Sequence, residues 1–154
     1  MSRKKLSIYV DGAARGNPGP AAIGVVVCSE DGSTIGNVSE YIGDATNNVA
    51  EYKALIYGLK KAREMEADEV SVNTDSELLA SQMTGRFKVK NEALKELFAE
   101  SMDLVRRFKN VEITRIPRSA NHGADKLANK ALDEIRAKAN KGPINNIRIN
   151  TDLL

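Results

Sequence analysis

Four carboxylates, each placed where a predicted strand ends or a predicted helix begins, are the residues of this sequence best suited to chemistry. They are Asp11, Glu51, Asp75 and Asp125. Carboxylates within a few ångströms of one another raise one another's pKa and destabilise the fold unless a cation neutralises them. Mg²⁺ and Mn²⁺ prefer all-oxygen sites, and a pair of such ions can drive phosphodiester hydrolysis. If the four side chains converge, the sequence therefore predicts a metal-dependent hydrolytic site.

Each acid also has an ordinary structural interpretation. Asp11 could form a turn with Gly12, and Asp75-Ser76 could form the N-cap of the helix predicted after it. Glu51 and Asp125 could lie in the first turn of a helix, where a carboxylate complements the helix dipole. Taken singly, each acid favours the structural interpretation. Taken together they favour a site, because Glu51 lies on an apolar helix face and because Asp11 and Asp75 each lie at the end of a strand.

The elements that must position these acids follow from the apolar periodicity and the turn residues. Leu6, Ile8 and Val10 alternate with polar residues, which predicts a first strand that stops at Gly12. The expected strands span residues 6–11, 22–29, 33–42, 69–74 and 111–116, and the expected helices span 47–66, 76–83, 91–108 and 123–139. This order predicts an α/β domain with a five-stranded mixed sheet, in which an antiparallel meander joins parallel strands and helices cover both faces. The domain is expected over residues 1–141, with a C-terminal tail over 142–154.

The predicted topology also says where the acids should meet. Ligands of open α/β sheets bind beyond the carboxyl ends of the strands. If the first and fourth strands are neighbours, Asp11 and Asp75 face the same crevice. Glu51 is in phase with Leu55 and Gly58 on the buried stripe of its helix, and a buried carboxylate needs a partner.

Composition limits the class of protein. The chain has 154 residues, of which 42% are hydrophobic and 29% charged, as in an ordinary soluble domain. The single cysteine, Cys28, excludes an internal disulfide and a cysteine-based zinc site. We find neither a signal peptide nor an apolar run long enough to cross a membrane, and we expect a monomeric cytoplasmic protein. Because the net charge is only +2, any nucleic-acid binding must depend on local patches.

Four blocks of this sequence make it resemble ribonuclease H of type 1, from about residue 5 to residue 139. The blocks are DGAARGNPGP at 11–20, TNNVAE at 46–51, TDS at 74–76 and NHGADKLAN at 121–129. They stand in the family's order and at compatible spacing. The family's ribonuclease H-like fold also agrees with the order of elements predicted above.

The resemblance implies an endonuclease that cuts the RNA strand of RNA/DNA hybrids and leaves 5′-phosphate and 3′-hydroxyl ends. Asp11, Glu51, Asp75 and Asp125 match the family's metal-binding carboxylates, which implies two Mg²⁺ ions per site, with Mn²⁺ as a substitute. Arg118 is expected in the catalytic loop, where its charge can stabilise a phosphate. The residues expected to contact the substrate are Gly12, Ala14, Asn17, Asn47 and Asn48.

The chain departs from some members of that family. It has no tryptophan, and residues 84–90 are expected in place of a long basic protrusion, which implies a subgroup that lacks the protrusion. His122 lies too close to Asp125 to match the mobile histidine of many relatives, and we expect it at a helix start. One alternative is a catalytically weak module that binds hybrid or double-stranded RNA. Another is a transposase-like, integrase-like or junction-resolving nuclease of the same fold. Cleavage of double-stranded RNA stays open.

Overall fold

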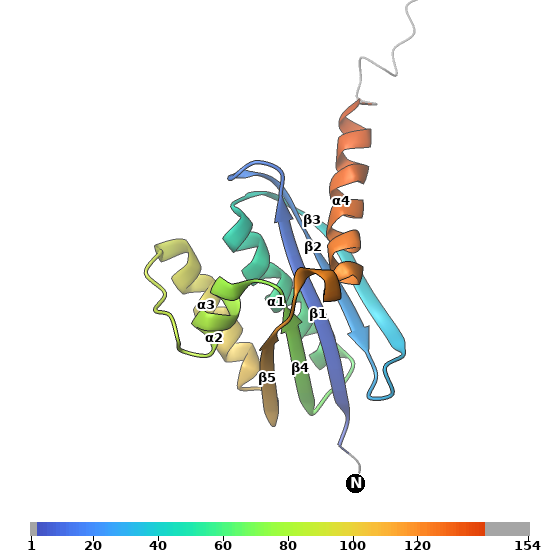
Figure 1. Ribbon diagram of the computed structural model, residues 1–154, viewed down its shortest axis with the longest axis vertical. Helices are drawn as coiled ribbons and strands as arrows, with labels where there is room; N and C mark the ends of the chain where they lie inside the picture. Colours follow the sequence, from blue (N-terminus) through green and yellow to red (C-terminus); the bar gives the residue numbers. More distant parts are fainter. Residues whose placement is uncertain (1–2, 141–154) are drawn as a thin grey trace, which may run out of the picture.

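A five-stranded mixed sheet in the order β3-β2-β1-β4-β5 forms the centre of the protein (Figure 1). The structure is a computed structural model that describes residues 3–140. The strands are β1 (Lys5–Ala14), β2 (Gly19–Cys28), β3 (Thr34–Ala45), β4 (Glu69–Thr74) and β5 (Asn110–Arg115). The first three strands pair antiparallel, β4 pairs parallel with β1, and β5 pairs parallel with β4. This arrangement confirms the predicted fold class, and the tail predicted over 142–154 lies outside the described residues.

Helices connect and cover the strands. They are α1 (Asn47–Glu64), α2 (Glu77–Met83), α3 (Glu92–Val105) and α4 (His122–Asn140), with a 3-10 turn, η1 (Arg118–Ala120), before α4. Thr46 caps α1 by accepting from the N–H of Val49, and Ser76 caps α2 in the same way. The cap predicted at Asp75-Ser76 is therefore present, and Ser76 rather than Asp75 supplies the capping oxygen. In the described part of the chain, no helix is long and apolar enough to cross a membrane.

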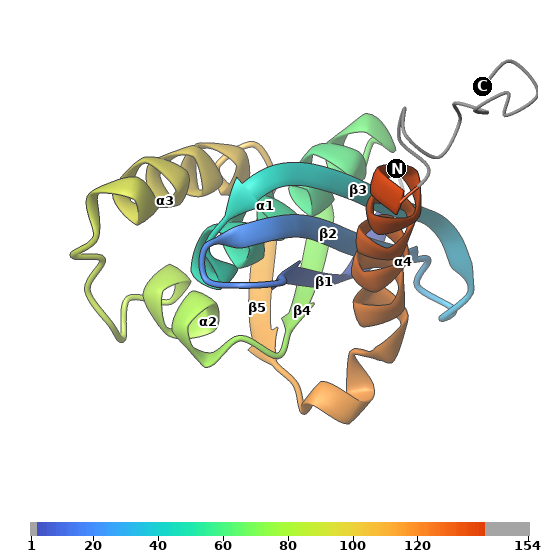
Figure 2. The ribbon, with the colours of Figure 1, turned by 90° about the horizontal axis from the view of Figure 1, so that it is seen from above.

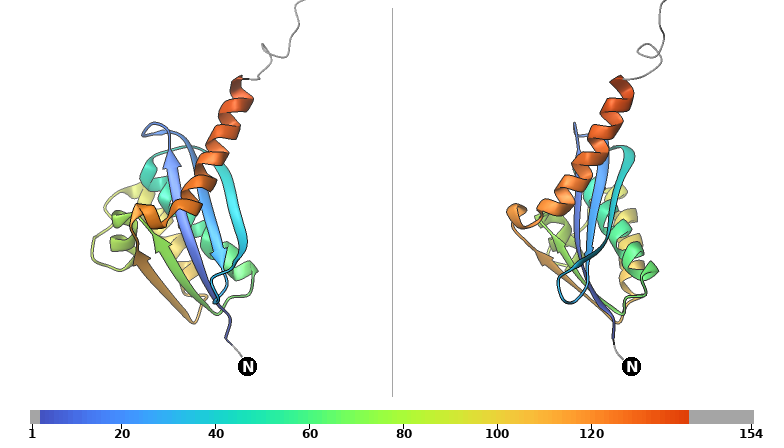
Figure 3. Two further views of the ribbon diagram at one scale, coloured as in Figure 1. Left: turned by 45° about the vertical axis from the view of Figure 1, so that its right-hand side comes forward. Right: turned by 90° about the vertical axis from the view of Figure 1, so that its right-hand side faces the viewer.

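The helices lie on both faces of the sheet, as predicted. Figure 2 and Figure 3 show α1 and α3 on one face and α4 on the opposite face. The main core lies between the sheet and α1 and α3, and its fully buried side chains include Leu6, Ile8, Val25, Tyr52, Leu55 and Leu59. On the other face, Ala22 packs with Ala131 and Leu132 of α4. Small residues at this contact let α4 approach the sheet closely.

The first strand is longer than the sequence predicted. β1 continues through Asp11 and Gly12 as far as Ala14. Its parallel partner β4 ends at Thr74, so the continuation pairs only with β2, where Ala14 faces Ala21. The predicted strand end is therefore wrong for β1 as a whole, although it marks the end of the parallel pairing.

Candidate active site

Asp11 and Asp75 lie side by side at the carboxyl edge of the parallel strands. The parallel pairing of β1 with β4 ends at Val10 and Thr74, and each aspartate is the next residue in the sequence. Asp11 is buried and Asp75 is half-buried. The sequence left open whether the first and fourth strands are neighbours. The structure pairs them, which explains why these two carboxylates meet.

A close contact between β1 and α1 brings in Glu51. A Cβ atom on Gly12 would lie 2.2 Å from the carbonyl carbon of Ala50 and 2.5 Å from the backbone nitrogen of Glu51, so only glycine fits there. The N–H of Gly12 donates a hydrogen bond of 2.5 Å to Oε1 of Glu51. This bond partners the buried carboxylate and holds it beside Asp11.

A second close contact brings in Asp125. Gly24 of β2 is the cross-strand neighbour of Asp11, and a Cβ atom on it would lie 2.0 Å from the carbonyl oxygen of Ala124 in α4. The helix therefore packs directly over the strand pair that carries Asp11. Asp125, the residue after Ala124, lies in the first turn of α4 and is half-buried.

The acids converge on one cavity of about 550 Å³. One carboxylate oxygen from each of Asp11, Glu51 and Asp75 lies within 4.8 Å of the others. Asp125 is outside this close triad but lines the same cavity, and it is near enough to Asp11 for a hydrogen bond between the two carboxyl groups. The structure thus brings all four predicted acids to one cavity. Three of them place carboxylate oxygens close enough together to bind the same metal ion.

Burial and like charge raise the proton affinity of this cluster. The pKa of Asp11 rises to about 9, first because the group is buried and then because Glu51, Asp75 and Asp125 lie beside it. Burial likewise raises the pKa of Glu51 to about 7, although the hydrogen bond from Gly12 opposes the rise. Asp75 adds to the rise for Glu51, and the charge of Arg118 opposes it. Without a cation, the cluster holds protons at a pH where isolated carboxyl groups have lost them.

The same features fit a divalent metal ion. Carboxylate oxygens are the ligands that hard divalent cations prefer, and the triad offers three of them to one point. A cation there would replace the protons that the raised pKa values of Asp11 and Glu51 indicate. The acidic cluster therefore has the composition of a site for a divalent metal.

The other predicted site residues are distributed unequally around the cavity. Gly12, Ala14, Asn47 and Arg118 line it, whereas Asn17, Asn48 and His122 are not among its lining residues. Asn17 instead accepts a hydrogen bond of 2.9 Å from the backbone N–H of Asn47. The N–H of Gly12 is already engaged with Glu51, so a contact of Gly12 with substrate stays a prediction. His122 is exposed as the first residue of α4, as the sequence predicted.

Sequence reasoning missed Asn121. Its side chain is 1% exposed, and its Nδ2 donates to the carbonyl oxygen of Val10 at 2.9 Å and to Oδ2 of Asp75 at 3.3 Å. Asn121 therefore ties the loop before α4 to β1 and to a carboxylate of the site. An asparagine just before a helix is usually read as a cap, so the sequence carries no signal of this tertiary contact.

Comparisons with known proteins agree with this geometry. A family model described as "Reverse transcriptase-like" matches residues 9–131. Ribonuclease HI of Halobacterium salinarum is 42% identical over 130 residues, which are 84% of this chain and 65% of that protein. Bifunctional protein Rv2228c of Mycobacterium tuberculosis is 45% identical over 130 residues, again 84% of this chain but 36% of that protein. The chain thus spans between about a third and two thirds of the length of these curated relatives.

Solved structures give the same result. The crystal structure of RNase H1 from Halobacterium salinarum has a TM-score of 0.83 at 42% identity, covering 84% of this chain and 98% of that one. LC11-RNase H1, in complex with an RNA/DNA hybrid, has a TM-score of 0.80 at 47% identity, with the same two coverages. The fold, the acidic cluster and these similarities together show that the chain belongs to the ribonuclease H family of type 1.

Proposed function

We propose that this protein is a metal-dependent endoribonuclease that hydrolyses the RNA strand of RNA/DNA hybrids and leaves 5′-phosphate and 3′-hydroxyl ends. The observation that carries the proposal is the convergence of Asp11, Glu51 and Asp75 within 4.8 Å, in a cavity that Asp125 and Arg118 also line. The hybrid bound to LC11-RNase H1, at 47% identity, supports the choice of substrate.

The proposed cofactor is a pair of Mg²⁺ ions, with Mn²⁺ as a substitute. Asp11, Glu51 and Asp75 would hold them together with Asp125, and Asp11 lies beside the other three acids. When bound, such ions activate a water molecule and stabilise the oxygen that leaves. The protein's own part is to keep the four carboxylates in place, through the Gly12 hydrogen bond to Glu51 and the packing of α4 over Gly24.

Arg118 and the cavity rim are proposed to bind the substrate. Arg118 lines the same cavity as the acids and its charge acts on Glu51, so it can offset the charge of a phosphate there. Asn47 and Ala14 line the cavity on the side of α1 and the end of β1, and we propose them as contacts to the sugar edge. An enzyme that separates RNA from DNA must read the 2′-hydroxyl. Asn17 and Asn48, beside them, stay predicted contacts.

Three finer points stay predictions from the sequence. Residues 84–90, in the connection between α2 and α3, are expected in place of the long basic protrusion of some relatives, and we expect weaker substrate binding as a result. The other two are a monomeric state and a cytoplasmic location, and cleavage of double-stranded RNA stays open.

The proposal is tested with three labelled duplexes, an RNA/DNA hybrid, an RNA duplex and a DNA duplex, each incubated with Mg²⁺ or Mn²⁺. We expect cleavage of the RNA strand of the hybrid, and none of the DNA duplex. Asp75→Asn should abolish the cleavage, and Glu134→Gln, on the exposed side of α4, should retain it. Hybrid binding without cleavage by the wild type would instead favour the binding module. Cleavage of the DNA duplex would favour a transposase-like nuclease.

A further inference from the structure

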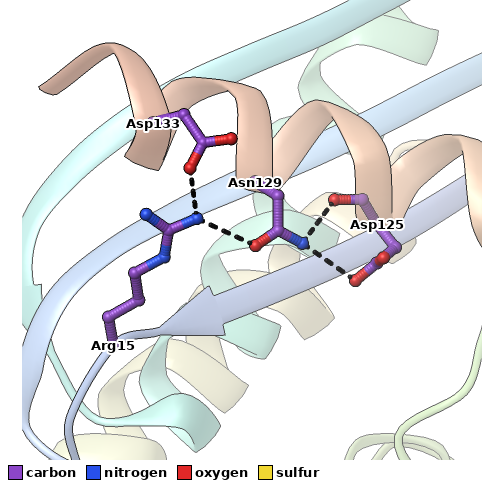
Figure 4. A network of polar contacts seen from close by, with 4 residues as sticks. All are labelled: Arg15, Asp125, Asn129 and Asp133. Carbon is purple, nitrogen blue, oxygen red and sulfur yellow. Dashed lines mark hydrogen bonds and ion pairs between the residues drawn. The ribbon is translucent and has the colours of Figure 1, made fainter. Parts of the chain in front are cut away.

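A polar stripe on α4 leads away from the acidic cluster. Asp125, Asn129 and Asp133 are spaced four residues apart, so they lie one above another along one side of the helix. Arg15, from the connection between β1 and β2, reaches across to the middle and far members of this stripe (Figure 4). The four side chains form one continuous chain of polar contacts that ends at a carboxylate of the site.

The contacts leave the Asn129 amide only one orientation. Its Nδ2 donates to the carbonyl oxygen of Asp125 at 3.0 Å and to Oδ1 of the same residue at 3.2 Å. Its Oδ1 accepts from Nη2 of Arg15 at 3.3 Å. A guanidinium has no acceptor and a carboxylate has no donor, so rotating the amide by 180° would oppose like groups at both ends. Arg15 therefore keeps the donating end of Asn129 pointed at Asp125.

Arg15 is itself held in place. Its Nη2 forms an ion pair of 2.6 Å with Oδ1 of Asp133. Its backbone N–H donates to the carbonyl oxygen of Pro20 at 2.8 Å, which closes the connection between β1 and β2. Asn17, in the same connection, accepts from the N–H of Asn47 in α1. The connection is thus joined both to the helix that carries Glu51 and to the helix that carries Asp125.

Of the four acids, Asp125 most needs such support. Asp11 and Asp75 follow paired strand residues, and Glu51 is held by the Gly12 N–H. Asp125 lies outside the close triad and is only half-buried. In the described part of the chain, the hydrogen bond that its carboxylate accepts from outside the acidic cluster comes from Asn129.

We infer that Asn129 and Arg15 are positioning residues that hold the Asp125 carboxylate toward the metal site, with Asp133 as the anchor of Arg15. The inference rests on the proposed function, because it assigns Asp125 a part in metal binding. Partners of metal ligands commonly set affinity and activity in this way without touching the ion.

The first test is the Mn²⁺ affinity of the full chain, measured by titration calorimetry without substrate. Asn129→Ala should weaken Mn²⁺ binding about 10-fold, as loss of a partner of a ligand does in other metal sites. Asp133→Asn should weaken it roughly 2- to 5-fold, because it removes only a partly exposed ion pair. Glu134→Gln is the matched control, since it removes the same charge from the next residue and should leave the affinity unchanged. Equal losses in Asp133→Asn and Glu134→Gln would mean that only net charge matters, and would overturn the role of Asp133.

The second test separates positioning from other roles. In an Asp125→Asn background, Asn129→Ala should cause no further loss of Mn²⁺ affinity, because there is no longer a carboxylate to position. A loss of about 10-fold that persists in that background, or an Asn129→Ala variant with wild-type affinity, would overturn the inference. Wild-type protein that binds no Mn²⁺ would contradict the proposed function itself, so the two failures are distinguishable. Far-UV circular dichroism confirms that each variant is folded.

Arg15 also lines the cavity, so a direct contact with substrate is the competing role. A positioning role predicts that Arg15→Ala lowers both kcat and Mn²⁺ affinity and changes KM little. A raised KM with unchanged Mn²⁺ affinity would assign Arg15 to substrate binding instead and overturn its positioning role.

Discussion

Asp11 and Glu51 are almost completely withdrawn from water, with 7% and 6% of each residue exposed. Burial and the neighbouring carboxylates disfavour the ionised form of both residues and raise their pKa values. The ionised cluster is therefore unfavourable in the metal-free protein, and a bound cation would relieve it. At the scale of single residues, the acids therefore favour metal binding at the expense of the stability of the metal-free protein.

Replacing one acid should separate these two effects. Asp11→Asn should reduce hybrid cleavage by more than about 100-fold, because it removes a metal ligand rather than the partner of one. The same change should stabilise the metal-free protein by about 1–3 kcal/mol at pH 8, because burying Asp11 at that pH requires it to take up a proton that the unfolded chain has lost, whereas asparagine is neutral already. Cleavage assays at saturating Mg²⁺ and urea unfolding in a chelator measure the two quantities.

The matched control for Asp11→Asn is Asp103→Asn, because Asp103 is an exposed acid on α3 that pairs with Arg106, the residue after the helix. It should change neither quantity appreciably. Near-wild-type cleavage by Asp11→Asn at saturating metal would contradict the assignment of Asp11 as a metal ligand.

The loop before α4 offers a second test at the residue scale. Arg118→Ala should lower kcat about 10- to 100-fold, because its charge faces the cavity and can stabilise a phosphate there. His122→Ala should change kcat by less than about 2-fold, because His122 is exposed and does not line the cavity. Steady-state kinetics on a labelled hybrid decide the comparison. If His122→Ala is the more damaging variant, the alignment of this loop with the family is wrong.

At the scale of elements, two glycines determine how closely the acid-bearing helices approach the sheet. Gly12 lets the backbone of α1 pass next to β1, and Gly24 lets α4 pass next to β2. Each contact joins an element to a strand far away in the sequence. Without them, Glu51 and Asp125 would lie farther from Asp11.

Gly24→Ala should therefore damage both the fold and the site. The new Cβ atom would lie 2.0 Å from the carbonyl oxygen of Ala124 and 2.8 Å from the N of Ala128, so α4 must move away from β2. We expect a loss of about 2–3 kcal/mol in the free energy of unfolding, typical of overpacking. Hybrid cleavage should fall as well, because Asp125 moves with the helix.

Gly36→Ala on β3 is the control, since its Cβ atom would have its nearest neighbour, Sδ of Met65, at 3.7 Å. It should change the free energy of unfolding by less than about 0.5 kcal/mol. Urea unfolding followed by circular dichroism compares the two variants. An equal effect of both would show that α4 does not depend on the close contact.

At the scale of the whole molecule, the acidic cluster couples stability to metal and to pH. Asp11 and Glu51 have a higher pKa in the folded than in the unfolded chain, so their contribution is fully present below the unfolded pKa values. That contribution is lost as the pH rises through about 7 for Glu51 and about 9 for Asp11. The metal-free protein should therefore lose stability as the pH rises over this range.

Metal should reverse the loss. Binding displaces the protons, so the stabilisation by Mg²⁺ should grow with pH and shrink below about pH 5, where carboxyl groups of ordinary pKa also begin to take up protons. At fixed pH the stabilisation follows RT ln(1 + [L]/Kd), about 2.7 kcal/mol at a hundredfold excess over Kd. Mn²⁺ should act at lower concentration than Mg²⁺. Melting series in both ions and at several pH values measure these effects, and a Tm indifferent to both ions would favour the binding module over the nuclease.

The order of strands and helices and the identity of the four acids were already determined by the sequence. Apolar periodicity, the turn residues and the helix starts are local signals, each readable within one window of the chain. The sequence also placed Asp11 and Asp75 at the ends of their strands. It left open whether those two strands are neighbours, and the structure pairs them in parallel.

Only the tertiary structure decided how the acids are held. The continuation of β1 past Asp11, the buried bond of Asn121 to Asp75 and the chain from Arg15 to Asp125 all join elements far apart in the sequence. Arg15 and Asp133 are 118 residues apart, and no local window relates them. Their contact exists because Gly24 lets α4 pack closely over β2. Since β2 pairs with β1 as far as Ala14, this packing places α4 beside the end of β1. Such contacts depend on the packing of the whole sheet, so the sequence determined which carboxylates meet and the tertiary structure decided which side chains position them.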